Sequence, residues 1–217
     1  KRLVGLLGSR VAERTVRVLS AVSEMSADNS ANQIAIAKAG GIAPLIQWLN
    51  GGLDRHSFSA EAQKEAASAV LAITTNNAST QVLVAKLGGI PPLIELVAKS
   101  KMETQEYAAR ALWHCAGNDE SKVIIAESGG IPPLVTMLSV DDTHAQELAA
   151  VVIARLSRSN STVAIAVADA GGIPALVRLV RAGSHVAMLQ AAAALAEVGA
   201  VPETRDAIAQ AKGMEPL

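Results

Sequence analysis

The side chains that most often carry out chemistry are few in this chain and far apart. Its single cysteine is Cys115, and its four histidines are His56, His114, His144 and His185. None of them stands in the short spacings that zinc ligands use, such as His-Glu-x-x-His or paired cysteines. No nucleophile or acid–base pair emerges either. We therefore predict that the chain is not an enzyme and has no catalytic residue, metal site or cofactor.

A recurring Gly-Gly-Ile triplet has to be distinguished from a phosphate-binding loop. The triplets begin at Gly40, Gly88, Gly129 and Gly171, which gives spacings of 48, 41 and 42 residues. They lack the patterns of nucleotide-binding loops, Gly-x-x-x-x-Gly-Lys and Gly-x-Gly-x-x-Gly. A β-branched residue precedes each by four positions, and the same register holds for a degenerate fifth copy at Lys212: these residues are Ile36, Val84, Ile125, Val167 and Ile208. The triplets therefore mark a structural repeat.

The chemistry around each triplet predicts a unit of three helices. The first glycine can take the left-handed conformation that ends a helix, and the proline that follows fits the first turn of the next helix. An apolar run such as 93–97 then predicts a short buried helix, and an alanine-rich stretch such as 108–115 predicts a longer one. The unit is thus a short helix, the Gly-Gly turn, a second helix and a long third helix.

This combination of Gly-Gly-Ile-Pro-Pro-Leu and Ala-Ala-x-Ala-Leu resembles the armadillo repeat family over essentially the whole chain. The resemblance implies an all-α fold, a right-handed α-solenoid of about five repeats with the first and last incomplete. We expect one domain, 1–217, taken from a longer array. Its expected units are 1–39, 40–87, 88–128, 129–170 and 171–211, followed by the start of another. The resemblance also implies that the third helices line a concave groove for an extended peptide or a helix.

Alignment of the predicted third helices gives three rows of equivalent positions along that groove. The rows are Ala21, Ala72, His114, Arg155 and Glu197, then Arg17, Ser68, Arg110, Val151 and Ala193, then Arg14, Glu65, Tyr107, Leu148 and Gln190. In the nuclear-import adaptors of the family the first two rows are typically Asn and Trp. This chain has neither residue there, so we do not expect it to recognise nuclear-localisation signals.

The polar members of these rows are the candidate partner-binding residues. We select Arg14, Arg17, Ser68, Tyr107, Arg110, His114, Arg155 and Glu197. Arginine recognises carboxylates well, and arginine and tyrosine are frequent at interface hot spots. The rows hold more arginines than glutamates, so we predict a partner segment with acidic character. An equally weighted alternative is that these are ordinary solvated helix residues.

Other notable side chains are better explained by structure than by binding. Cys115, Trp48 and Trp113 align with apolar residues of other units and are expected in the core. Asn77 and Asn160 match the glycosylation sequon, but their positions before a helix favour caps. The long 48-residue spacing implies an insertion near residues 50–58. It is expected to be a surface loop, with a groove-edge contact by His56 and Phe58 as the alternative.

Bulk composition limits the remaining functions. The net charge is −1 and the pI is about 6.5, with both signs mixed along the chain, which argues against nucleic acid as a partner. Every apolar run is shorter than a membrane span, and the single cysteine fits a reducing compartment, cytoplasmic or nuclear. We predict a non-catalytic protein–protein interaction scaffold whose oligomeric state stays open. The alternatives are a regulatory or substrate-recruiting segment of a larger enzyme, such as a ubiquitin ligase or kinase, and a structural part of a cytoskeletal or ciliary assembly.

Overall fold

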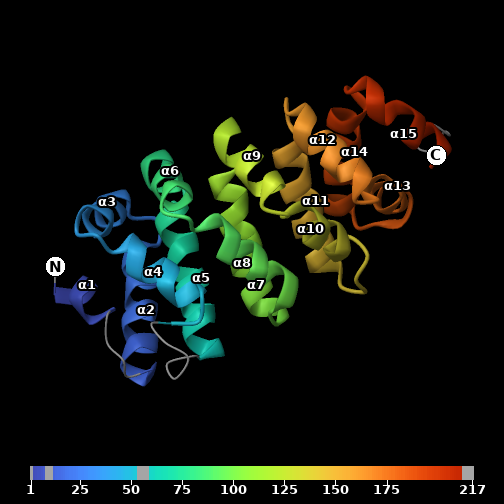
Figure 1. The fold of residues 1–217 in the computed structure, drawn as a ribbon. Helices are drawn as coiled ribbons and strands as arrows, with labels where there is room; N and C mark the ends of the chain where they lie inside the picture. Colours follow the sequence, from blue (N-terminus) through green and yellow to red (C-terminus); the bar gives the residue numbers. More distant parts are fainter. Residues whose placement is uncertain (1, 8–11, 53–58, 212–217) are drawn as a thin grey trace. The chain divides into compact units, whose positions relative to one another are not determined.

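The computed structural model describes residues 2–7, 12–52 and 59–211, and every regular element in these residues is a helix (Figure 1). The chain forms two compact units, residues 1–117 and 118–217. The first unit contains α1 (Arg2–Leu6), α2 (Ala12–Ser26), α3 (Ser30–Lys38), α4 (Ile42–Leu49), α5 (Ala60–Thr74), α6 (Ala78–Lys86), α7 (Ile90–Lys99) and α8 (Met102–Cys115). The second contains α9 (Asp119–Glu127), α10 (Ile131–Met137), α11 (Thr143–Ser157), α12 (Ser161–Asp169), α13 (Gly172–Ala182), α14 (His185–Gly199), a 3-10 turn η1 (Pro202–Thr204) and α15 (Arg205–Gln210). His56, Phe58 and the degenerate triplet at Lys212 lie outside the described residues.

The predicted three-helix unit is present in both halves of the chain. Helices α6, α7 and α8 have 9, 10 and 14 residues, and α9, α10 and α11 have 9, 7 and 15. In the first unit the long third helices α2, α5 and α8 pack side by side, as α11 and α14 do in the second. The alanine-rich faces allow this close approach: Ala66, Ala67, Ala108, Ala109 and Ala149 are all fully buried.

The two glycines of each triplet have different tasks, as the turn after α6 shows. Gly88 has a φ of +78°, the left-handed conformation predicted for the first glycine. Gly89 has an ordinary φ, but a Cβ there would lie 2.6 Å from Val84 Cγ1 and 3.0 Å from the Val84 carbonyl oxygen. The first glycine therefore turns the chain, and the second leaves room for the β-branched residue of the preceding helix. Together they bend the chain by 85° between α6 and α7.

An asparagine caps the first helix of every complete three-helix repeat. The side-chain oxygen of Asn77 accepts a hydrogen bond from Thr80 N at 3.3 Å, and that of Asn160 accepts one from Val163 N at 3.1 Å, which confirms both as caps. Asn29 and Asn118 make the same contact at 3.0 and 2.8 Å. All four share the spacing of the glycine triplets, so the cap belongs to the repeat.

A long polar side chain on the first helix binds the end of a third helix, a feature that the hydrophobic pattern did not reveal. Gln33 Nε2 donates to the carbonyl oxygens of Ser26 at 3.1 Å and Ala72 at 2.9 Å, near the ends of α2 and α5. Lys122 Nζ donates in the same way to the Arg158 carbonyl oxygen, beyond α11, at 2.8 Å. Carbonyl groups in the last turn of a helix lack partners within the helix, so these buried side chains satisfy them.

The core holds the residues that the repeat register selected. Val84, Ile125 and Val167 are fully buried, and Ile36 and Ile208 nearly so. Trp48 is also fully buried, as predicted. Its indole Nε1 donates to the Leu7 carbonyl oxygen at 2.9 Å, which supplies the partner that a buried indole needs.

Cys115 is the small core residue that the alignment predicted. Its side chain is fully buried, and desolvation raises the pKa of the thiol to about 12. Since the thiolate is the reactive form, we expect Cys115 of the native protein to resist an aromatic disulfide reagent at mildly alkaline pH, and to react fully once denaturant unfolds the chain. The released chromophore measures both reactions. A fast, stoichiometric reaction of the native protein would contradict this burial.

Candidate functional site

In the first unit, the exposed face of the three long helices contains a hollow of about 250 Å³. Three predicted binding residues line it: Ser68 from α5, and Arg110 and His114 from α8. Two further lining residues, Asp28 and Thr75, come from the turns that follow α2 and α5. The lining is partly apolar because it also includes Leu71 and Ala72 of α5.

Polar contacts fix several of these side chains. His114 Nε2 lies 3.4 Å from Thr75 Oγ1, and its ring meets the Trp113 ring edge-on, with 4.9 Å between ring centroids. Arg110 Nη1 lies 3.2 Å from Glu106 Oε1, one turn earlier on α8, while half of the arginine side chain stays exposed. The guanidinium is thus oriented by its neighbour and still open to solvent.

The charge of this face is more mixed than the sequence rows implied. Asp28 lines the hollow together with Arg110 and His114, and Glu106 pairs with Arg110. Neither acidic residue belongs to the aligned rows, so the rows alone do not describe the charge around the hollow. The hollow combines one arginine and one histidine with a carboxylate and several hydroxyl groups.

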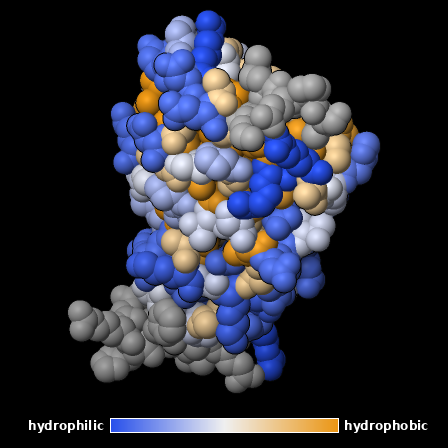
Figure 2. All heavy atoms as spheres, turned by 90° about the vertical axis from the view of Figure 1, so that its right-hand side faces the viewer, coloured by the Kyte–Doolittle hydropathy of each residue, from blue (hydrophilic) through white to orange (hydrophobic). Residues whose placement is uncertain are grey.

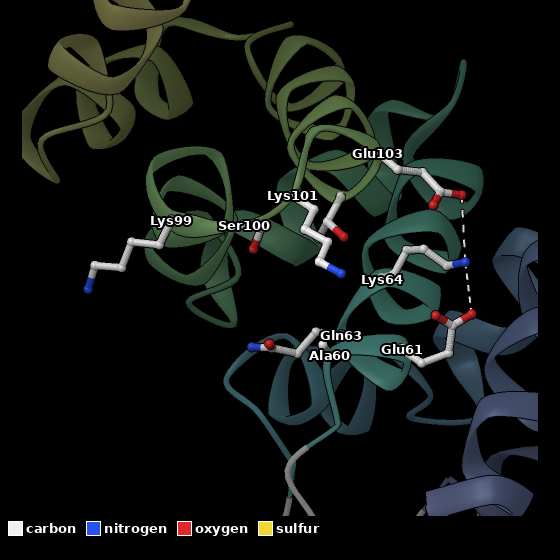
Figure 3. A pocket seen from close by; sticks show the side chains of 9 residues that line it. Ala60, Glu61, Gln63, Lys64, Lys99, Ser100, Lys101 and Glu103 are labelled. Carbon is white, nitrogen blue, oxygen red and sulfur yellow. Dashed lines mark ion pairs between the residues drawn. The ribbon is translucent and has the colours of Figure 1, made fainter.

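A second hollow, of about 350 Å³, lies at the starts of α5 and α8 (Figure 3). Figure 3 shows the Lys64 ammonium between the carboxylates of Glu61 and Glu103, which lie 2.8 and 3.6 Å away, and Glu65 is also 3.6 Å from it. The hydrogen bond that Lys64 donates to Glu61 raises the pKa of Lys64 above its ordinary value and outweighs desolvation, which lowers it. Lys64 therefore stays charged and joins α5 to α8, and carboxylates dominate its immediate surroundings.

The remaining predicted residues do not join the first hollow. Arg14 and Arg17 are exposed on α2, and Tyr107 is partly buried on α8. In the second unit, Arg155 is partly buried on α11, where desolvation and then the charge of Arg158 lower its pKa. Glu197 of α14 accepts a hydrogen bond from Ser159 N at 3.1 Å, so it supports the turn after α11.

The described residues also bear on two other kinds of site, a metal centre and a membrane span. No group of three or more His, Cys, Asp or Glu side chains there could hold a metal ion. No single helix in that part of the chain is long and apolar enough to cross a membrane. Three pairs of consecutive helices are long and apolar enough when taken together, by length and composition alone, but each pair is sharply bent.

Comparison with known proteins identifies the repeat. The model of the armadillo/beta-catenin-like repeat matches residues 76–117 and 118–158. An engineered protein of known crystal structure is 31% identical, with a TM-score of 0.89 over 98% of this chain and 84% of that one. The chain belongs to the armadillo repeat family. The predicted all-α solenoid of armadillo-type repeats is thereby confirmed.

More distant armadillo structures share the fold. A designed armadillo repeat protein in complex with the peptide (KR)4 is 24% identical, with a TM-score of 0.87 over 98% of this chain and 87% of that one. An armadillo-repeats-only protein from Plasmodium falciparum is 16% identical, with a TM-score of 0.75 over 85% and 80% of the two chains. No curated protein sequence is similar enough to this chain to count as a match. The predicted single domain and its unit limits stay a prediction.

The armadillo register locates four of the nine residues that line the hollow, namely Ser68, Ala72, Arg110 and His114. It missed Asp28 and Thr75 because the aligned rows stop at the helix ends, whereas both residues lie in the turns that follow. It also placed Trp113 in the core, but that side chain is only partly buried. Trp113 aligns with Leu71 and Ala154, which are partly buried too, so this position is at the edge of the core in every unit compared.

Proposed function

We propose that this armadillo repeat chain is an interaction scaffold that binds an extended or helical segment of a partner protein on its third-helix face. The observation that carries the proposal is the hollow lined by Ser68, Arg110 and His114. Armadillo folds are typically non-catalytic scaffolds, and a designed protein of this fold is in complex with a peptide. A hollow lined by both apolar and polar residues suits one or two side chains of such a segment.

The residue types on α8 support binding at this point of the chain. Tyr107, Arg110 and Trp113 are all incompletely buried and follow one another at helical spacing. Arginine, tyrosine and tryptophan are the residues most enriched at interface hot spots. The chain has only four Phe, Tyr and Trp residues in all, so two of them on one binding helix is a notable concentration. The partly exposed Leu71 of α5 adds an apolar contact.

We further propose that the bound segment presents a carboxylate to Arg110 and His114. A guanidinium can hold a carboxylate with two parallel hydrogen bonds, and Arg110 has exposed surface left after its contact with Glu106. Asp28 and Glu106 reduce the attraction for long acidic runs, so the expected segment carries isolated acidic residues among apolar ones. The ligand differs in charge from the (KR)4 peptide of the designed armadillo protein.

Selection from a random peptide display library tests both parts of this proposal. We expect the enriched peptides to contain Asp or Glu next to apolar residues. Their affinity should fall about tenfold or more for Arg110→Glu, because the variant replaces an attractive contact with a repulsive one. Lys86→Glu is the matched control, since it makes the same charge change on an exposed residue of α6.

The location of the site and the acidic character of the bound segment can be disproved separately. Enriched peptides that are basic, like (KR)4, would disprove the acidic character of the bound segment. If a variant of this face still weakens their binding, the proposed location of the site is retained. Peptides that bind wild type and Arg110→Glu equally well would show that the site lies elsewhere on the molecule. Circular dichroism of each variant establishes that it is folded.

A further inference from the structure

The start of α8 differs from the starts of α5, α11 and α14, the other third helices whose caps are described. In those helices the residue before the first turn has a side-chain oxygen that accepts a hydrogen bond from the amide three residues later. The pairs are Ser59 with Ala62, Asp142 with Ala145 and Ser184 with Ala187, at 3.2, 2.8 and 3.1 Å. In α8 this position holds Lys101, whose side chain can only donate, and no side chain caps the helix.

The amides of the first turn of α8 are therefore open. The first amides of a helix have no partner within it, and those of Met102, Glu103 and Thr104 have no acceptor among the described residues. Such amides point out of the helix end, which also carries the positive end of the helix dipole. The second hollow lies at this end, because Lys101, Glu103 and Thr104 line it. Open amides at a helix start are the arrangement that binds anions.

Thr104 is an independent sign of a ligand at the same place. The corresponding residue of the other three helices is an alanine, since it follows the cap by three positions. Thr104 is only 7% exposed and lines the hollow, yet its hydroxyl makes no hydrogen bond to any described residue. Buried hydroxyl groups normally have a partner. At this position the chain replaces a methyl group by a hydroxyl whose partner has to come from the hollow.

The charges of the hollow are divided between two sides. Its charged lining consists of three lysines and two glutamates: Lys64, Lys99, Lys101, Glu61 and Glu103. Figure 3 shows both carboxylates turned toward Lys64, with Lys101 and Ser100 on the side away from them. Lys99 pairs with Glu95 at 2.7 Å. Lys101 is exposed and has no ion pair with a described residue, so its ammonium is the cation left for a ligand.

The start of α14 shows the ordinary, satisfied arrangement. Ser184 Oγ accepts from Ala187 N and donates to Glu147 Oε1 at 2.6 Å, so the cap and the first turn satisfy each other. Figure 2 views the molecule from the side of α13, α14 and α15 and shows hydrophobic residues exposed there between hydrophilic ones. Neither a set of open donors nor one gathered apolar patch marks that side as clearly as the donors mark the start of α8.

We propose that the start of α8 binds a phosphate group. The site, which we call the α8 anion site, consists of the side chains of Ser100, Lys101 and Thr104 and the amides of the first turn. A phosphate oxygen takes the place that the Asp142 carboxylate has at the start of α11, where the chain supplies the acidic oxygen itself. Phosphate suits this site better than carboxylate, because its additional oxygens can accept from the amides, the two hydroxyl groups and the ammonium together.

The phosphate group can be a free ion or part of a phosphorylated side chain of a partner protein. Both have the same oxygens, and the hollow of about 350 Å³ is open to either. The site shares no lining residue with the hollow of Ser68, Arg110 and His114, so it does not depend on the peptide-binding proposal.

Titration of the ¹⁵N-labelled chain with inorganic phosphate, followed by amide NMR shifts, tests the proposal. We expect the signals of Met102, Glu103 and Thr104 to shift and to reach saturation. Sodium chloride at the same ionic strength should leave them in place. The amide of Ala62 is an internal reference, because Ser59 already caps it and phosphate should hardly move its signal.

Two variants restore residues that other third helices carry, so both should fold. Lys101→Asp introduces the cap of α11, and its carboxylate competes for the open amides. Phosphate affinity should fall about tenfold or more, while the melting midpoint rises. Thr104→Ala should weaken binding about threefold to tenfold through the loss of one hydrogen bond. Lys99→Asp is the matched control, since it makes the same charge change on a lysine that already pairs with Glu95.

Saturating shifts that Lys101→Asp abolishes, Thr104→Ala weakens and Lys99→Asp largely retains support the α8 anion site. Signals that stay in place with phosphate, or that move equally with chloride, overturn it. Equal losses in Lys101→Asp and Lys99→Asp overturn it as well, because the ion would then respond to the general charge of the surface and not to the helix start.

A short peptide with one phosphoserine distinguishes the two sources of the phosphate group. Tighter binding than inorganic phosphate, absent for the same peptide without the phosphate, supports the site and assigns it to a phosphorylated partner. Affinity equal to that of inorganic phosphate supports the site and assigns it to the free ion. A phosphopeptide that binds without moving the signals of the first turn of α8 overturns the proposed location.

Discussion

Replacement of Ile125 by aspartate is expected to unfold the second unit or to destabilise it severely. Ile125 is fully buried on α9, four residues before the glycine turn. The substitution removes the burial of an aliphatic side chain, worth about 1.5–3 kcal/mol, and places a carboxyl group among apolar neighbours at a further cost of about 1–3 kcal/mol. The sum is a large share of the roughly 5–15 kcal/mol that stabilises a typical domain. The midpoint of a far-UV circular dichroism melt should therefore fall by about 10 °C or more.

Ile165→Asp is the control for this prediction. It makes the same substitution on α12 of the same unit, but Ile165 is one of the exposed large hydrophobic residues. Surface substitutions of this kind usually change the free energy of unfolding by no more than about 0.5 kcal/mol. Equal effects of the two substitutions would mean that burial does not decide the loss, and a melt of Ile125→Asp that overlays the wild type would refute the register on which this core depends.

The parts of the fold that the sequence predicts well are those determined by neighbouring residues. A left-handed glycine, a proline in a first turn and alternating apolar and polar helix positions act over a few residues, so their recurrence reveals the unit. The same register placed Ser68 and Arg110 at equivalent positions on adjacent helices, and His114 one turn after Arg110 on α8. Contacts between units are different, because they join residues about forty positions apart whose pairing depends on how the helices stack.

Asp28 and Lys64 show what the register could not provide. Asp28 reaches the hollow from a turn in which its φ is +50°, a conformation that local spacing does not reveal. Lys64 pairs with Glu61 on its own helix, which a spacing of three residues predicts, but also with Glu103 on the next third helix. The charge of a helix face depends on such pairs, so a count of residue types in each row does not determine it.

Replacement of Gly89 by alanine is expected to destabilise the first unit by about 1–3 kcal/mol, the usual cost of overpacking a tight site. The added Cβ would lie 2.6 Å from Val84 Cγ1 and 3.0 Å from the Val84 carbonyl oxygen, with Ile46 Cδ1 at 3.2 Å. The carbonyl oxygen belongs to the backbone and accepts a hydrogen bond of 2.9 Å from Gly89 N, so the clash cannot be relieved by rotating one side chain. Chemical denaturation of the wild type and the variant measures the change.

The neighbouring glycine separates this steric effect from backbone strain. A Cβ on Gly88 would meet nothing within 4 Å, so Gly88→Ala should cost only the strain of its φ of +78°, about 1–2 kcal/mol, and Gly88→Asn less, because asparagine tolerates that conformation. Gly89→Asn should recover nothing relative to Gly89→Ala.

A double-mutant cycle with Val84→Ala then isolates the contact itself. Removal of Val84 Cγ1 should lower the cost of Gly89→Ala by about 0.5 kcal/mol or more, although the carbonyl oxygen keeps part of the penalty. Strictly additive effects would show that the second glycine is required for a reason other than its contact with the β-branched residue of the preceding helix.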